Sequence, residues 1–334
     1  MTPATADAMK SADPAPNNGS GHGPGHGSGH GFGHALLSWG TRELRDLPWR
    51  ATRDPWAILV AESMLQQTQV DRVVGPYHAF LARFPTAAEC AGVPVAEVIR
   101  YWAGLGYNRR AVRLHGAATA VMARHGGAVP GDLDELLALP GVGSYTARAI
   151  LAFAFEADHG VVDTNAGRVM ARAVAGRRLT AAEAQRLADS VVPRGQAWLW
   201  NQTVLDLGAT VCRSADPSCN RCPVAPHCCW AAAGHPSPDP AVGGAASPRR
   251  QATFEGSDRQ VRGRLIAALR QQPIPYGDVA RVAGVPADPT RAHRLADALA
   301  AEGMAEWNGQ TLALPGDDYP PSASQPVGES AMVR

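Results

Sequence analysis

Leu139-Pro140-Gly141-Val142-Gly143-Ser144-Tyr145-Thr146-Ala147 lies between two stretches of helical periodicity, residues 132–138 and 144–155. The two glycines let the turn tighten and expose successive backbone N–H groups where the second helix begins. Such N–H groups at the positive end of a helix form a phosphate cradle that needs no basic side chain. Taken alone, the segment is equally an ordinary turn between helices. The rest of the chain must distinguish a phosphate-binding turn from an ordinary one.

The helical pattern of this segment extends over most of the chain. Apolar residues recur at three- and four-residue spacing, and alternating β-branched runs are few. The sequence therefore predicts an all-α domain over residues 34–230. The expected helices are 56–70, 72–83, 94–103, 108–125, 132–138, 144–155, 164–175, 181–191 and 196–211.

Four cysteines, Cys212, Cys219, Cys222 and Cys228, follow the spacing C-x6-C-x2-C-x5-C near the end of this domain. The spacing brings four thiolates onto one small loop, residues 212–228, which is the ligand set of a [4Fe–4S] cluster. A structural zinc site is the alternative. Zinc ribbons usually pair two C-x2-C knuckles from separate hairpins, whereas this loop has a single C-x2-C.

The composition is that of an ordinary globular protein. A chain of 334 residues suits about two domains, and its 45% hydrophobic content is enough for a buried core. Neither an eighteen-residue apolar run nor a charged segment followed by an apolar one is found, so we expect no membrane partner and no secretory signal. The cysteines crowd into one loop instead of pairing across the fold. We expect a cytoplasmic, nucleoid-associated monomer.

The basic residues are almost all arginines, because Lys10 is the only lysine among 31 lysines and arginines. The guanidinium forks onto phosphate and keeps its charge, which suits a nucleic-acid surface. A mechanism that needs a Schiff-base lysine has almost no residue to use. The net charge of +1 argues against a strongly salt-driven binder, so phosphate contacts must come from local arginines and backbone N–H groups.

Three segments have the composition of tails or linkers. Residues 1–33 contain almost no large apolar side chain and are expected to be disordered. Residues 231–253 are rich in Ala, Gly and Pro and are expected to be a linker, and residues 316–334 to be a disordered tail. Histidines recur every fourth residue at 22, 26, 30 and 34, which suggests metal binding. Glycines between them oppose a stable helix, so a low-complexity tail is the alternative.

A small second domain is predicted over residues 254–315. It contains three helical segments and a stretch, 305–314, that alternates about Asn308-Gly309 as a β-hairpin does. Three helices closed by a hairpin predict a winged-helix-like unit. Such a unit serves in DNA binding, in protein contact or as a structural element, and the sequence leaves these alternatives open. The helical segments are 258–269, 276–282 and 288–302.

The chain resembles the helix-hairpin-helix DNA glycosylase superfamily and, within it, the MutY-type adenine glycosylases. The resemblance covers about residues 35–229 and rests on the order and spacing of six pieces, the last being the cysteine loop. It implies a helix-hairpin-helix glycosylase fold with a [4Fe–4S] loop and base-excision repair of double-stranded DNA. The other pieces are Arg45-Asp-Leu-Pro-Trp-Arg50, Glu62-Ser-Met-Leu-Gln-Gln-Thr-Gln-Val70, Gly104-Leu-Gly-Tyr107, Leu139–Ala147 and Val162-Asp-Thr-Asn165.

The chemistry of base removal needs two carboxyl groups in different environments. An acid must protonate the leaving base, and an anion must face the positive charge that develops on the sugar. Glu62 lies in the apolar run 58–65, so burial should raise its pKa and keep it protonated. The resemblance makes Glu62 the acid at adenine N7 and then the base for water. It leaves Asp163 ionised beside the sugar cation, with Tyr145 and Asn165 as supporting residues; an N-cap is the alternative for Asp163.

The resemblance also assigns residues to the DNA. Arg50 and Gln202 match positions that line the adenine pocket, and glutamine pairs well with the edge of adenine. Gln67 and Tyr107 match residues that wedge into the duplex, and Thr68 falls where the family touches the oxidised guanine. The full assignment to substrate is Arg50, Leu65, Gln67, Thr68, Tyr107 and Gln202, and the assignment to the DNA backbone is Gly141, Gly143, Arg213 and Arg221.

The expected activity is hydrolysis of adenine mispaired with 8-oxoguanine or guanine, by a monofunctional glycosylase. An endonuclease III-like glycosylase/lyase is one alternative, but that group has a catalytic lysine where Tyr145 stands. Thymine-mismatch glycosylases share the tyrosine and fit Glu62 less well. An iron–sulfur redox-sensing regulator is an alternative of another class, which would leave Glu62, Tyr145 and Asp163 without a purpose.

Three departures from the family pattern concern the choice of partner base. Nothing resembles the β-rich Nudix-like domain that inspects 8-oxoguanine, and Asp163-Thr164-Asn165 and Tyr107-Asn108 each differ by one residue from commoner versions. The preference for 8-oxoguanine therefore depends mainly on Thr68 and its neighbours.

Overall fold

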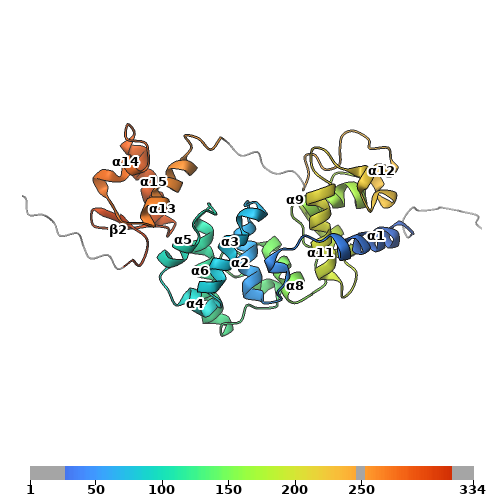
Figure 1. Cartoon of the computed structure of the whole chain (residues 1–334), viewed down its shortest axis with the longest axis horizontal. Helices are drawn as coiled ribbons and strands as arrows, with labels where there is room; N and C mark the ends of the chain where they lie inside the picture. The colour runs from blue at the N-terminus through green and yellow to red at the C-terminus, as the bar shows by residue number, and fades with distance from the viewer. Residues whose placement is uncertain (1–26, 246–252, 318–334) are drawn as a thin grey trace, which may run out of the picture.

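The computed structural model describes residues 27–245 and 253–317. Most of these residues form three units, and Figure 1 shows the C-terminal unit at the left, a helical unit in the middle and the cysteine-containing unit at the right. We call them the helical unit (residues 55–154), the cysteine unit (helix α1 with residues 164–245) and the winged unit (residues 253–317). No helix in the described part of the chain is both long and apolar enough to span a membrane.

The helical unit is built around helix α2, whose residues Trp56 to Met64 are all buried. Asp54 caps this helix by accepting hydrogen bonds from the backbone nitrogens of Trp56 (3.1 Å) and Ala57 (3.3 Å), and Pro55 occupies the first helical position. A helix that is apolar on every side must lie inside a bundle. The helices of the unit are α2 (Pro55–Leu65), α3 (Val74–Arg83), α4 (Ala87–Ala91), α5 (Val95–Tyr101), α6 (Arg109–His125), α7 (Leu133–Leu137) and α8 (Ser144–Ala154).

The cysteine unit brings distant parts of the chain together. Helix α1, from the start of the described chain, packs on α11, with the ring of Phe32 edge-on to Trp200 at 6.0 Å. The helices of the unit are α1 (Gly27–Glu43), α9 (Thr164–Val169), α10 (Ala181–Val191), α11 (Ala197–Asp206) and α12 (Cys229–Ala232), with π-helical turns η3 (Met170–Ala175) and η4 (Leu207–Val211). Outside the winged unit, the described chain also has short 3₁₀ turns: η1 (Pro48–Arg50), η2 (Val70–Arg72) in the helical unit, and η5 (Cys219–Arg221) and η6 (Ala225–His227) in the cysteine unit.

The beginning of α1 corrects the prediction of a disordered tail over residues 1–33. Residues 27–33 are helical although they are rich in glycine. Phe32 and Leu36 are buried in the cysteine unit, and this packing supplies the stability that the local sequence lacks. His34 therefore lies on a helix, which glycine was expected to prevent, while residues 1–26 lie outside the described residues.

The predicted linker also begins later than expected. Residues 231–245 fold back onto the cysteine unit, where Ala241 is buried and the indole nitrogen of Trp230 donates to the carbonyl of Pro236 at 3.0 Å. Asp239 forms a salt bridge with the buried guanidinium of Arg172. A composition rich in Ala, Gly and Pro therefore did not distinguish a packed segment from a linker, because the salt bridge that holds the segment joins Arg172 and Asp239 across 67 positions of sequence.

The winged unit has the predicted three helices and hairpin. Its strands form one antiparallel sheet in the order β1-β3-β2, with Ile274 and Trp307 both opposite Leu312. The chain order of helix, strand, two helices and two strands is that of a winged helix-turn-helix. The elements are α13 (Asp258–Leu269), β1 (Ile274–Pro275), η7 (Tyr276–Asp278), α14 (Val279–Val282), α15 (Pro289–Ala301), β2 (Glu306–Asn308) and β3 (Thr311–Ala313).

Candidate active site

Glu62 is a buried carboxylic acid near the end of α2. Its side chain is buried, and no described residue gives its Oε2 atom a hydrogen-bond partner. Burial raises the pKa of Glu62 from 4.5 to about 7, a hydrogen bond with Tyr145 opposes the rise, and the nearby charge of Asp163 adds to it. The predicted protonated acid is therefore consistent with its surroundings, and one of its oxygens is left for a ligand.

Asp163 and Tyr145 lie beside Glu62. Asp163 caps α9, where its Oδ1 accepts from the backbone nitrogen of Ala166 at 2.7 Å and its Oδ2 from Asn165 Nδ2 at 2.9 Å. Burial raises the pKa of Asp163, while these two donors favour its anion. The carboxylate is thus both an N-cap and a member of the site. The structure brings together the four residues that the sequence assigned to catalysis.

Arg50 and Gln202 lie in one buried network with Asp206. The Nε atom of Arg50 donates to Gln202 Oε1 at 2.7 Å, and its two terminal nitrogens grip Asp206 at 2.8 and 2.9 Å. Because Oε1 of Gln202 is held by Arg50, the amide nitrogen of Gln202 points away from the arginine. Arg50 also helps to stabilise the charged form of Glu62, which places the network next to the acid.

The sequence did not single out Asp206, which the structure places at the centre of this network. Asp206 is fully buried and also accepts from the backbone nitrogen and Nε of Arg45 at 2.9 and 2.8 Å. Its arginine partners hold the pKa of Asp206 below its usual range in spite of burial. The contacts span more than 150 positions of sequence. No local pattern reveals such a pair.

Two exposed loops carry the predicted wedge residues. Leu65 ends α2, and Gln67 in the following turn has a φ of +57°. Tyr107 has a φ of +45° and is 41% exposed. A side chain at positive φ is strained, and such residues persist only where the surroundings hold them. The geometry suits rings and amides that project from the surface.

Arg110, which no pattern in the sequence singled out, ties these two loops together from inside. Its side chain is buried, and one terminal nitrogen donates to the carbonyls of residues 63, 64 and 66 at 2.7 to 2.9 Å. The other donates to Thr68 Oγ1 at 3.0 Å and to the carbonyls of residues 105 and 106 at 3.2 and 3.1 Å. Desolvation lowers the pKa of Arg110 to about 10, which leaves it charged at neutral pH. Thr68 is thereby fixed by the arginine.

The hairpin between α7 and α8 is exposed at its tip. Gly141 has a φ of +78°, and a Cβ there would come within 2.7 Å of the Cβ of Arg113. Gly143, the exposed N-cap residue of α8, has no side chain that could cap the first N–H groups of that helix. The phosphate cradle stays a prediction, with which the exposed turn at Gly141 and Gly143 is compatible.

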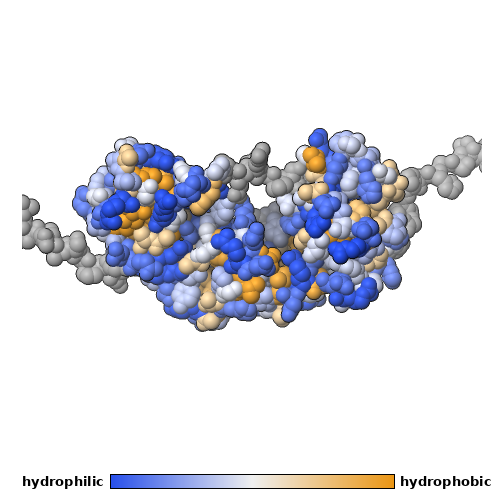
Figure 2. All heavy atoms as spheres, turned by 45° about the horizontal axis from the view of Figure 1, so that its top comes forward, coloured by the Kyte–Doolittle hydropathy of each residue, from blue (hydrophilic) through white to orange (hydrophobic). Residues whose placement is uncertain are grey.

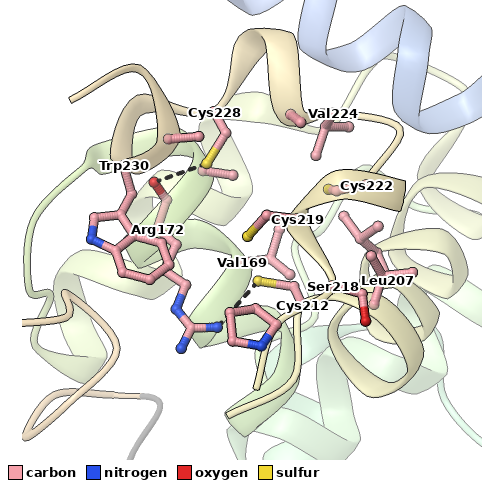
Figure 3. Close-up of a pocket in the computed structure, with 15 residues that line it drawn as sticks. Val169, Arg172, Leu207, Cys212, Ser218, Cys219, Cys222, Val224, Cys228 and Trp230 are labelled. Atoms are coloured by element: carbon pink, nitrogen blue, oxygen red, sulfur yellow. Dashed lines mark hydrogen bonds between the residues drawn. The ribbon is translucent and has the colours of Figure 1, made fainter. Parts of the chain in front are cut away.

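The four cysteines of the loop line one cavity in the cysteine unit, and Figure 3 shows their sulfurs directed toward the same space. Arg172 lies at the edge of the cavity, with Nη1 3.5 Å from the sulfur of Cys212. Within residues 27–245 and 253–317, no three His, Cys, Asp or Glu side chains are arranged around a single metal-ion position. The other lining is largely apolar and includes Val169, Leu207, Val211, Val224 and Trp230.

The arginines of the cysteine loop are exposed. Arg213 donates to Asp216 at 3.1 Å, and Arg221 ends the turn η5 at the surface. A third arginine, Arg168, which no sequence pattern marked, connects this loop to the active site. It donates to Asn165 Oδ1 at 2.7 Å and to the carbonyl of Cys212 at 2.6 Å.

Comparison with known proteins agrees with this architecture. Residues 60–194 match the family model described as the HhH-GPD superfamily base excision DNA repair protein. The chain is 42% identical over 275 residues to the adenine DNA glycosylase of Mycolicibacterium smegmatis, covering 81% of this chain and 91% of that one. It is 40% identical over 208 residues to the human adenine DNA glycosylase, covering 58% and 38% of the two chains.

Solved structures share the fold. A thermostable thymine-DNA glycosylase superposes with a TM-score of 0.57 at 29% identity, over 62% of this chain and 97% of that chain. An endonuclease III–DNA covalent intermediate gives a TM-score of 0.52 at 23% identity, over 60% and 92%. The chain belongs to the HhH-GPD superfamily of base excision DNA repair proteins, and within it to the adenine DNA glycosylase family. It is therefore a glycosylase, an enzyme that hydrolyses N-glycosyl bonds.

Proposed function

We propose that the chain is a monofunctional glycosylase that removes adenine mispaired with 8-oxoguanine, and also with guanine, from double-stranded DNA. The observation that carries this proposal is the pair formed by Glu62 and Asp163. One carboxyl is buried, has a pKa of about 7 and keeps one oxygen without a hydrogen-bond partner among the described residues, while the other is held by backbone and amide donors. The adenine DNA glycosylases similar to this chain support adenine as the base.

The pair divides the work of glycosidic bond cleavage. Glu62 donates its proton to the leaving adenine, and the Asp163 carboxylate stabilises the positive charge on the sugar. Tyr145 positions the acid through their hydrogen bond. The proton that Glu62 loses is regained from the attacking water, which completes the hydrolysis.

The absence of a suitable lysine favours hydrolysis over strand cleavage. A lyase forms a Schiff base, and Lys10, the only lysine, lies in the segment that precedes the described residues. Tyr145 occupies the beginning of α8 beside Glu62, and its hydroxyl does not form a Schiff base. We therefore expect strand breaks only when the product is treated with alkali.

Recognition of the partner base is assigned to the loops that Arg110 holds. Thr68, Gln67 and Tyr107 lie on these loops, where side chains reach the surface. An exposed ring at positive φ is placed to stack beside an orphan base, and stacking of this kind contributes about 1–3 kcal/mol per base. The preference for 8-oxoguanine is the finer part of the proposal.

We also propose that the cysteine loop holds a [4Fe–4S] cluster through Cys212, Cys219, Cys222 and Cys228. The fit is supported by the cavity that these thiols share, because a cluster occupies volume whereas a single zinc ion sits between its ligands. The apolar lining and the adjacent cation of Arg172 suit an anionic cluster of thiolates. The cluster would fix the loop that carries Arg213 and Arg221 toward DNA phosphates.

The test of the activity is single-turnover release of adenine from duplexes with adenine opposite 8-oxoguanine, guanine, cytosine or thymine. Strand scission is scored with and without alkali. Release opposite 8-oxoguanine, with breaks only after alkali, is the expected result. Scission without alkali would replace hydrolysis with a lyase reaction, and no release from any duplex would refute the proposed function.

The test of the cluster is chemical analysis of iron, acid-labile sulfide and zinc in the purified protein. Four irons and four sulfides per chain are expected. Cys222→Ser should lower both, whereas Cys90→Ser, at a buried cysteine of the helical unit, should leave them unchanged. One zinc per chain without sulfide would establish the alternative site.

A further inference from the structure

The winged unit docks on the helical unit beside the loop that carries Tyr107. The two units form one continuous surface (Figure 2). The backbone nitrogen of Ala96 donates to the carbonyl of Pro315 at 3.3 Å, and Arg100 forms a salt bridge with Asp317. Glu302 of the winged unit pairs with Arg109 at 3.8 Å, and Arg109 is two positions after the predicted wedge residue.

The central contact of this interface is made by Arg270, at the end of α13. Its Nε donates to the carbonyl of Ile99 at 3.0 Å, and its Nη2 donates to Asn108 Oδ1 at 2.7 Å. Asn108 stands at the N-cap of α6, where an asparagine normally accepts from the backbone of its own helix. Here it makes no such capping bond, and its oxygen is used for Arg270.

The loop before Asn108 needs support from its surroundings. Gly104, Gly106 and Tyr107 all have positive φ, and for a tyrosine this conformation is strained. Arg110 holds the loop from inside through the carbonyls of residues 105 and 106. Arg270 holds the residue that directly follows Tyr107 from the outside. This loop, residues 104–107, which we call the wedge loop, is thus fixed by two arginines, one from each unit.

The charge of the winged unit argues against a role in binding DNA, which its fold also suggests. Residues 253–317 contain seven arginines and eight acidic residues, so the unit lacks the basic excess of a DNA-binding domain. On α15, the helix that would enter a groove, Arg291 and Arg294 are both paired with Asp258. The unit is better suited to contact its own chain than to read DNA.

We infer that the winged unit is an internal brace for the wedge loop, and that Arg270 is a positioning residue that sets Tyr107 through Asn108. The role of this brace in mismatch recognition rests on the proposed function. Support of the loop that carries Tyr107 by Arg270 does not depend on that function. It also gives the side chain of Asn108 a use other than capping, because its oxygen is the acceptor that Arg270 uses.

The experiment compares the wild-type chain with Arg270→Met, Asn108→Ala and the double variant, all in the full-length protein. The matched control is Arg291→Met, the same substitution in the same unit at an ion pair with Asp258. Two quantities are measured: amide hydrogen exchange of residues 104–109 in the free protein, and the ratio of affinities for a mismatched and a matched duplex.

Each single variant should raise exchange in the loop and lower the affinity ratio by about fivefold, the factor carried by one hydrogen bond. The double variant should be no worse than Arg270→Met alone, since Asn108→Ala removes a contact that Arg270→Met has already removed. Arg291→Met should leave both quantities unchanged.

Loop exchange in Arg270→Met equal to that in Arg291→Met would overturn the inference. If Arg270→Met unfolds the winged unit, Asn108→Ala, which alters only the helical unit, still decides. A wild-type chain that releases no adenine would refute the proposed function. The amide exchange of residues 104–109 would still show whether Arg270 supports the loop.

Discussion

Replacing Glu62 by glutamine should abolish base release and at the same time stabilise the folded protein at alkaline pH. Glutamine keeps the shape of the side chain but has no proton to donate to adenine. General acid catalysis contributes about 10²- to 10⁴-fold to a rate, so the single-turnover rate of adenine release should fall by that factor. The affinity for the mismatched duplex should change little, because the substituted atom acts on the reacting base.

The effect on stability follows from the burial of the carboxyl. The pKa of Glu62 is raised from 4.5 to about 7, so the folded state binds this proton more tightly than the unfolded state does. The contribution of the group to stability is therefore complete below pH 4.5 and is lost as the pH rises to about 7. One pKa unit corresponds to about 1.4 kcal/mol, so ionised Glu62 should destabilise the fold by ~3 kcal/mol at pH 8.

Thermal or denaturant unfolding of both proteins at pH 5 and pH 8 measures this difference. The glutamine variant should be more stable than the wild type by ~3 kcal/mol at pH 8 and by little at pH 5. Glu135→Gln, the same change at an exposed glutamate, should show no such dependence. The reasoning is wrong if Glu62→Gln releases adenine at near-normal rate, or if its advantage in stability is the same at both pH values.

Three further changes test other parts of the site. Asp163→Asn removes the negative charge beside the sugar and should slow single-turnover release at least 100-fold, with duplex affinity nearly unchanged; a rate within tenfold of wild type would argue against that role. Gly141→Ala should lower stability by about 1–2 kcal/mol and weaken binding to any duplex, because φ is +78° and Arg113 blocks a Cβ. As a control, Gly143→Ala, at a position with no atom near the added Cβ, should retain stability. Arg110→Lys cannot hold both loops and should cost about 2–3 kcal/mol in unfolding free energy while lowering mismatch preference; equal loss for matched and mismatched duplexes would contradict its proposed role.

The parts of the molecule that were predictable are those encoded within one helix or one loop. The spacing of the cysteines placed four thiols around one cavity, and the apolar run around Glu62 correctly indicated a buried acid. A helix is present in the structure for each one predicted between residues 56 and 211, although the helix predicted over 56–70 ends at Leu65. These features depend on neighbours within about ten residues, which a periodic pattern records directly.

The parts that were missed depend on contacts between distant residues. Asp206 meets Arg50 across 156 positions, and Arg270 meets Asn108 across 162. The glycine-rich beginning of α1 is helical because Phe32 packs on Trp200, a partner far along the chain. Helix propensity and composition contain no information about such partners, so they gave a disordered tail for this segment.

The almost exclusive use of arginine serves the architecture of the protein as well as the predicted surface for phosphates. The composition favoured a surface for phosphates, yet several arginines are buried or half-buried and act on the protein itself. Arg110 gathers carbonyls from two loops, Arg172 meets the cysteine loop, and Arg270 joins two units. A planar guanidinium has five donors in a fixed arrangement, so one side chain can hold several backbone oxygens at once. An ammonium group on a flexible stem has only three donors and no fixed geometry. Arg110, Arg172 and Arg270 therefore organise loops and units of the protein itself, a use of arginine that the composition alone did not indicate.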